Sequence, residues 1–252
     1  MIWTWWRRWR RAQVLSRCRI DASLWEEIIS RTPAARYLDQ ADRIRLRDLA
    51  SLFLREKSIE FAGGLKPTDA MPVRIACEAC IPVLNLPGDL DNYRGWYSVI
   101  LYPGEFIARH EYHDDAGVVH LDVEARSGES WEIGPVIISW GDVQAEHAGY
   151  SVIIHEMAHK LDMLDGAANG FPPLQRGMQR TEWTQVFSTA FKEMRRRVDA
   201  GEPVEMNDYA LEDPGEFFAV ASEYFFTAPG VLRREFPEVY EQLALYYRQR
   251  PG

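Results

Sequence analysis

The sequence predicts a single α+β domain with helices around a small mixed sheet, and three observations support this fold class. Between about residues 97 and 140, apolar and polar residues alternate with the period of two that is typical of strands. On both sides of this segment, apolar residues recur at helical spacing. The chain of 252 residues shows no internal repeat, and a chain of this length can bury a large core as one domain.

The N-terminal segment, residues 1–19, is basic and rich in Trp and Arg. It carries six Arg and no acidic residue, and we treat it as separate from one domain over residues 20–252. Its apolar side chains fall at positions i, i+3, i+4 and i+7 of a helix (Ile2, Trp5, Trp6 and Trp9). We expect either weak contact of residues 1–11 with an anionic membrane surface or a loosely docked tail.

Helices are expected before the strand region. The spacing from Ser23 to Glu26 fits a capping box, and apolar residues at helical spacing continue to residue 56. A second helical segment covers about 69–81, where Pro82 should end it.

Three strands are then expected at about 99–102, 119–124 and 135–140. Residues 119–124 alternate as in a sheet with one solvated face. Pro135 places the last strand at a sheet edge or makes the proline its first residue. If that strand is at an edge, it could pair with an extended substrate.

The C-terminal half is predicted to be helical. Helices should cover about 149–162 and 181–199, and a further one should begin at Asp213-Pro214 and run through Phe226. After Pro229 we expect one terminal helix that reaches about residue 248.

The most informative motif is His155-Glu156-Met157-Ala158-His159. On a helix, residues i and i+4 share one face, so His155 and His159 can bind one metal ion together. Glu156 projects about 100° away from His155, where it can reach a water on the metal but is poorly placed as a ligand. Two nitrogen ligands and one carboxylate base are what zinc-dependent peptide hydrolysis requires.

The residues alone do not decide which side chain is the third metal ligand. No His follows His159 at short range, which excludes one zinc subtype and leaves Glu216 or Glu223. Glu216 could instead complete a capping box with Asp213. Glu223 lies in an apolar run where an unpaired carboxylate is costly, so the residues slightly favour Glu223 as the ligand.

The chain resembles the Mlc titration factor A family of bacterial metallopeptidases, whose catalytic core is similar to that of anthrax lethal factor. The likeness runs from about Ala76 to Phe236. It is carried by four stretches: Val99-Ile-Leu-Tyr-Pro103, Gly134-Pro-Val-Ile-Ile-Ser-Trp140, His155-Glu-Met-Ala-His-Lys-Leu-Asp162 and Ser222-Glu-Tyr-Phe-Phe226.

The resemblance implies a zincin-like (gluzincin) domain with the motif helix at its centre. In that family a Tyr that assists catalysis lies seven residues before the ligand Glu, which selects Tyr209 and Glu216. It thus implies that His155, His159 and Glu216 hold one Zn²⁺ per chain. Glu223 then becomes a carboxylate that orients a ligand His or packs the helix.

The implied activity is hydrolysis of peptide bonds by a zinc-activated water, with aminopeptidase cleavage included. Glu156 would act as general base and Tyr209 would stabilise the oxyanion. The expected partners are peptide or protein substrates. The family's named role adds the transcriptional repressor Mlc or a counterpart, and binding of this repressor would influence sugar uptake. The alternative function is a repressor-sequestering binding protein with little or no physiological peptidase activity.

Charge and cysteine content limit the other classes. Outside residues 1–19, 23 basic residues face 38 acidic ones, a net −15, so direct binding of nucleic acid is not expected. No apolar run is long enough to span a bilayer. Three cysteines do not form a disulfide framework, which favours a cytoplasmic protein, and Cys77 and Cys80 are expected in the core.

Overall fold

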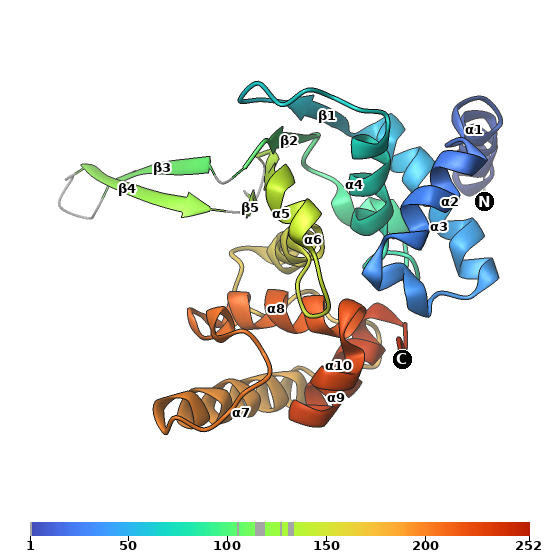
Figure 1. The fold of residues 1–252 in the computed structure, drawn as a ribbon. Coiled ribbons are helices and arrows are strands. Elements are labelled where there is room, and N and C mark those ends of the chain that lie inside the picture. The colour runs from blue at the N-terminus through green and yellow to red at the C-terminus, as the bar shows by residue number, and fades with distance from the viewer. Residues whose placement is uncertain (1, 105, 114–118, 127, 131–133) are drawn as a thin grey trace.

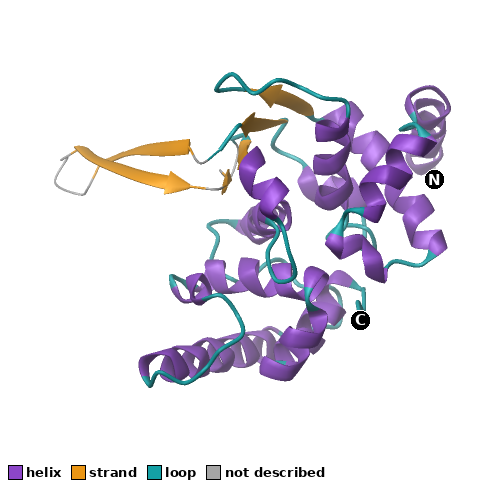
Figure 2. Cartoon of the chain, in the orientation of Figure 1, coloured by secondary structure: helices purple, strands orange, loops and turns teal. Residues whose placement is uncertain are grey.

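The computed structural model describes residues 2–104, 106–113, 119–126, 128–130 and 134–252, with side chains described outside residues 1–8, 10 and 105–133. Helices dominate this part of the chain (Figures 1 and 2). The α-helices are α1 (Ile2–Cys18), α2 (Ala22–Ser30), α3 (Gln40–Glu56), α4 (Ala70–Cys80), α5 (Trp140–Ala145), α6 (Val152–Asp162), α7 (Arg180–Asp199), α8 (Pro214–Thr227), α9 (Pro229–Glu235) and α10 (Pro237–Tyr247). Short 3₁₀ turns are η1 (Pro33–Tyr37), η2 (Asp89–Tyr93), η3 (Met163–Asp165) and η4 (Asp208–Leu211).

The strands form one small mixed sheet and a separate hairpin. They are β1 (Ser58–Phe61), β2 (Ser98–Tyr102), β3 (Phe106–His113), β4 (Val119–Arg126), β5 (Gly128–Ser130) and β6 (Val136–Ser139). The sheet has the order β1-β2-β6-β5, in which the first three strands are parallel and β5 runs antiparallel to β6. The β3–β4 hairpin projects away from the body (Figure 1). The predicted strands at 99–102, 119–124 and 135–140 are therefore present, and the alternation expected at 119–124 lies outside the described side chains.

The position of β6 corrects one expectation. Pro135 immediately precedes β6, as a strand start allows, but β6 is an inner strand because β2 and β5 cover its two sides. Of the two alternatives for Pro135, the strand start is therefore correct, and the outer strand on this side of the described sheet is β5. Trp140 is not part of the strand, because Ser139 caps α5 there by accepting from the Asp142 amide.

Burial on the sheet follows the strand period and fixes α6 beneath it. Val99 and Leu101 of β2 and Val136 and Ile138 of β6 are fully buried. The apolar residues of α6 that precede and follow the first His are buried too (Val152, Ile153, Ile154, Met157, Ala158 and Leu161). α6 contacts α4 and β6, and α8 packs along it (Figure 1). One helix thus joins the sheet layer to the C-terminal helices.

The start of α6 is tightly fixed. Ser151 caps the helix by accepting from the Ile154 amide. Gly149 has φ of +89°, and a Cβ there would lie 2.7 Å from the Tyr224 ring. Because both the backbone conformation and the close contact require glycine, α6 and α8 approach each other closely at this point.

Two helix boundaries differ from the sequence prediction. Asp21, not Ser23, caps α2, since its carboxylate accepts from the Ser23 and Leu24 amides. The terminal helix expected from Pro229 to about 248 is two helices, α9 and α10. Pro237 separates them, because proline clashes with the preceding turn but fits the first turn of a new helix.

Cys77 and Cys80 are fully buried and free, as expected for core residues. Burial raises the pKa of the Cys77 thiol to about 12, which keeps it protonated and unreactive. The described part of the chain contains no helix long and apolar enough to cross a membrane.

The N-terminal segment forms a helix that docks on the domain. α1 packs against α3, and Arg11 forms a two-point ion pair with Asp89, with Nη1 2.7 Å from Oδ2. This contact shows docking at the C-terminal half of α1. Membrane contact of residues 1–11 stays a prediction, because the side chains at 1–8 and 10 lie outside the description.

Candidate metal centre

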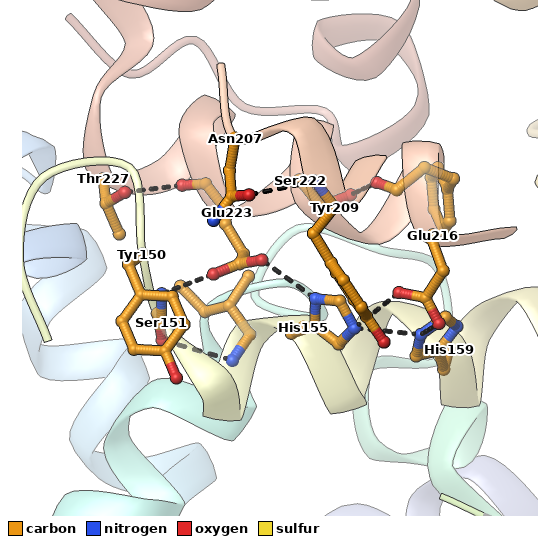
Figure 3. Close-up of polar contacts among 12 residues, drawn as sticks. Tyr150, Ser151, His155, His159, Asn207, Tyr209, Glu216, Ser222, Glu223 and Thr227 are labelled. Atoms are coloured by element: carbon orange, nitrogen blue, oxygen red, sulfur yellow. Dashed lines mark hydrogen bonds and ion pairs between the residues drawn. The ribbon is translucent and has the colours of Figure 1, made fainter. Parts of the chain in front are cut away.

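Three side chains from two helices converge on one point (Figure 3). His155 and His159 project from α6, and Glu216 projects from the first turn of α8. Nε2 of His155 lies 3.0 Å from one Glu216 oxygen, and Nε2 of His159 lies 3.3 Å from the other. The two Nε2 atoms are 3.1 Å apart. All three side chains offer a ligand atom within 4.8 Å of the others, so a single ion could contact all three.

The donor set matches a catalytic zinc site. Two imidazole nitrogens and one carboxylate are a common ligand set, and a fourth position is left for water or substrate. The i, i+4 spacing gives the two imidazoles a common face, and Asp213 places Glu216 by capping α8 through the Gly215 and Glu216 amides. The residues that the resemblance indicated as ligands are thus brought together in space.

Charge is concentrated between these residues. Burial lowers the pKa of His155, but hydrogen bonds with Glu216 and Glu223 outweigh burial and raise that pKa well above its usual value. For Glu216, burial raises the pKa, while contacts with His155 and His159 dominate and hold it below its usual range. An anionic Glu216 faces two imidazoles. A divalent cation can bind between these three groups and replace the protons on the imidazole nitrogens.

Glu223 lies on the other side of His155 (Figure 3). Its Oε1 is 2.9 Å from Nδ1 of His155, and its Oε2 accepts from the Ser151 amide at 2.6 Å. Contact with Nδ1 fixes the ring so that Nε2 faces Glu216. The geometry therefore favours Glu216 over Glu223, which the apolar surroundings alone had slightly favoured. The burial of Glu223 is explained by two hydrogen bonds rather than by a metal.

Glu156 follows His155 on α6 and is buried. Lys160, one turn later, is also buried, and its ammonium donates to the Gly134 carbonyl at 3.2 Å. Burial lowers the pKa of Lys160 to about 8, against the opposing effect of the Glu156 carboxylate. The acid next to the ligand pair thus lies in a low-dielectric setting with a cation nearby.

Tyr209 approaches the cluster from η4. Its ring centroid is 6.0 Å from that of His155, and its hydroxyl is directed toward the two imidazoles (Figure 3). Asn207 holds the turn by accepting from the Tyr209 amide at 2.9 Å. Tyr209 is 48% exposed, so its hydroxyl lies where the site opens to solvent.

Comparison with known proteins shows the family to which the chain belongs. Residues 5–248 match the family model of the glucose-regulated metallo-peptidase M90. The chain belongs to the M90 metallopeptidase family. It is 37% identical to Mlc titration factor A of Serratia proteamaculans over 232 residues, 90% of this chain and 87% of the relative. It is 40% identical to the protein of that name in Pectobacterium atrosepticum over 235 residues, 90% of this chain and 86% of the relative.

Two parts of this M90 chain's site escaped the sequence prediction. Asp162, at the end of α6, is fully buried and accepts from the Asn169 and Gly170 amides at 2.7 and 2.6 Å. A Cβ on Gly170 would lie 2.3 Å from the Pro214 carbonyl oxygen, so this loop is pressed against the start of α8. In the sequence, only the Gly- and Asn-rich composition after α6 could have indicated this fixed loop.

The second is a buried polar cluster at the start of α6. The Arg74 guanidinium pairs with both Glu78 and Glu146. Ser151 Oγ lies 2.7 Å from Glu78 Oε2 and 3.0 Å from Glu146 Oε1. Since Glu223 accepts from the Ser151 amide, the same residue links this cluster to His155. No local motif indicates these contacts, because their partners are distant in sequence.

Proposed function

We propose that this chain is a zinc-dependent peptidase with a zincin-like (gluzincin) domain. The observation that carries the proposal is the convergence of His155, His159 and Glu216 within 4.8 Å, with the buried Glu156 next to His155 on α6. One zinc ion per chain would be held by the two Nε2 atoms and the Glu216 carboxylate. When bound, zinc lowers the pKa of the attacking water and polarises the substrate carbonyl.

Three side chains would then transfer the proton, stabilise the oxyanion and orient a metal ligand. Glu156 accepts a proton from the attacking water and passes it to the leaving amine. Tyr209 donates a hydrogen bond from its hydroxyl to the oxyanion that develops on the substrate. Glu223 keeps the His155 ring in the orientation that its Nδ1 contact defines.

The substrate would lie along β5. This strand is the outer strand on the β6 side of the described sheet and also contacts α6. An extended peptide could add to its edge through main-chain hydrogen bonds and pass over the metal centre.

The names of the relatives favour a second role. They are called Mlc titration factor A, which supports binding of a repressor such as Mlc by this chain as well. The alternative to catalysis is a binding protein with little or no physiological peptidase activity. Because a transcriptional repressor acts in the cytoplasm, this role would place the chain in the cytoplasm.

The test combines zinc content with turnover on a fluorogenic peptide or a denatured protein substrate. Glu156→Gln should keep one zinc per chain and lose at least about 10²-fold in kcat, whereas Glu216→Ala should lose both zinc and turnover. Wild-type protein that holds zinc but turns over no better than Glu156→Gln would overturn catalysis. In that case, repressor binding by both variants would support the sequestering role.

A further inference from the structure

A long aromatic groove runs along α7, apart from the metal centre. It is a hollow of about 630 Å³ between α7, the first turns of α8 and the loop 165–171. α8 lies between α6 and α7 (Figure 1), and Phe217 lines the groove while the preceding Glu216 contacts the imidazoles. The groove and the metal centre are therefore on different faces of α8.

Aromatic rings line the groove, and most of them belong to the core beneath it. Trp183 and Phe187 are stacked with ring centroids 4.2 Å apart, and Phe217 meets Phe187 edge-on at 6.0 Å and Phe191 at 5.8 Å. Phe171 and Phe191 are only half-buried. Half-covered aromatic rings in a concave site are typical of surfaces that receive an apolar side chain.

The shape favours an elongated ligand. Arg180, Thr184, Ser188 and Lys192 line it at intervals of four residues, so the groove follows one face of α7. The rise of an α-helix makes this face about 18 Å long. That is the length of about twelve residues of a partner helix laid along it.

The charge of the rim defines the ligand further. Arg180 and Lys192 stand at the two ends and are exposed, and the Arg180 guanidinium lies over the Phe171 ring at 4.6 Å. Within the described residues, neither cation is ion-paired, and Asp165 is the acid that lines the groove. The whole chain has a net charge of −9, so the positive charge of this rim is opposite to the net charge of the molecule.

We propose that this groove binds an amphipathic acidic helix of a partner protein, with apolar side chains against Phe171 and Phe191 and carboxylates at Arg180 and Lys192. Apolar burial would supply most of the affinity, and the two cations would select acidic over basic segments. The proposal does not depend on the proposed peptidase activity, because the groove shares no ligand of the metal centre.

Fluorescence anisotropy with a labelled, end-capped 15-residue peptide tests this site. The peptide carries Leu and Phe on one helical face and Glu on the others, and a matched peptide carries Lys in place of every Glu. Binding is measured on the full chain, and mass spectrometry checks that the peptide stays intact. We expect the Glu peptide to bind at least about tenfold more tightly than the Lys peptide, and to weaken as salt is raised.

Variants locate the contact. Arg180→Glu and Lys192→Glu should each weaken binding of the Glu peptide about tenfold, and Thr184→Trp should weaken it by filling the groove. Lys66→Glu makes the same charge change on an exposed residue outside the groove and should leave binding within about twofold. Equal binding of the two peptides, binding of neither, an unchanged Kd in Thr184→Trp, or an equal loss in Lys66→Glu would each overturn the proposal. Zinc content should be the same in all four variants.

Discussion

At the scale of single residues, Glu216 and Glu223 show how position decides the role of a carboxylate. They lie seven residues apart on α8, yet one faces Nε2 of His155 and the other faces Nδ1 of the same ring. An imidazole held at one nitrogen presents the other in a fixed direction. We therefore expect Glu223 to act as a positioning residue, whose loss affects the metal centre without emptying it.

We expect Glu223→Ala to weaken zinc binding about 10- to 100-fold, since the His155 ring loses its restraint. Glu223→Gln keeps an acceptor oxygen and should lose less. Competition against a calibrated chelator measures both affinities. Zinc that disappears from Glu223→Ala as completely as from Glu216→Ala would identify Glu223 as a ligand, contrary to the geometry.

Tyr209 allows a sharper test of catalysis. Removal of one hydroxyl from the oxyanion site should lower kcat about 10²-fold with zinc content unchanged. Tyr209→Phe keeps the ring against His155, so its packing stays the same. Tyr97→Phe is the control, because Tyr97 is 75% exposed and immediately precedes β2. Equal turnover in Tyr209→Phe and wild type would remove Tyr209 from the mechanism.

At the scale of elements, the loop after α6 sets where α8 begins. Asp162 holds the Asn169 and Gly170 amides, and Gly170 packs against Pro214. Asp162→Ala leaves the buried Gly170 amide and the partly buried Asn169 amide without an acceptor and should destabilise the protein by about 2–3 kcal/mol. Urea unfolding measures this loss, with Asp69→Ala as the control because the exposed Asp69 makes no side-chain cap contact. A change below about 0.5 kcal/mol in Asp162→Ala would contradict this role.

The elements also show what the sequence could predict. The helices at 69–81, 149–162, 181–199 and 213–226 agree with α4, α6, α7 and α8 within a few residues, because periodicity and caps are local signals. The placement of His155 and His159 on one face of α6 follows from the same local spacing. By contrast, the edge role of β5 and the contact of Glu223 with Ser151, 72 residues away in sequence, depend on tertiary packing. Without the resemblance, local reasoning on burial selected Glu223 over Glu216.

At the scale of the whole molecule, two buried polar systems meet at the start of α6. Arg74 of α4 pairs with Glu78 on its own helix and with Glu146 after α5, and Ser151 joins both acids to α6. One cation between two carboxylates leaves a formal excess of negative charge in the interior. Such a charge is costly unless one acid holds a proton.

This cluster should make stability depend on pH. Burial, reinforced by the Glu78 carboxylate, raises the pKa of Glu146 well above its usual value. A group with a raised folded-state pKa contributes stability that is complete below its unfolded pKa, near 4.5, and is lost as the pH rises through the folded value. Glu146→Gln keeps the size and a hydrogen-bonding end group but removes this titration. The variant should therefore match wild type near pH 4.5 and become progressively more stable than wild type at higher pH.

Thermal unfolding of metal-free protein between pH 4.5 and 9 measures this difference. Each kcal/mol gained should raise Tm by about 2–4 °C for a chain of this size. Glu26→Gln, on the exposed face of α2, should follow the wild-type curve at every pH. If the Tm difference between Glu146→Gln and wild type is constant across the range, the proton is held elsewhere in the cluster.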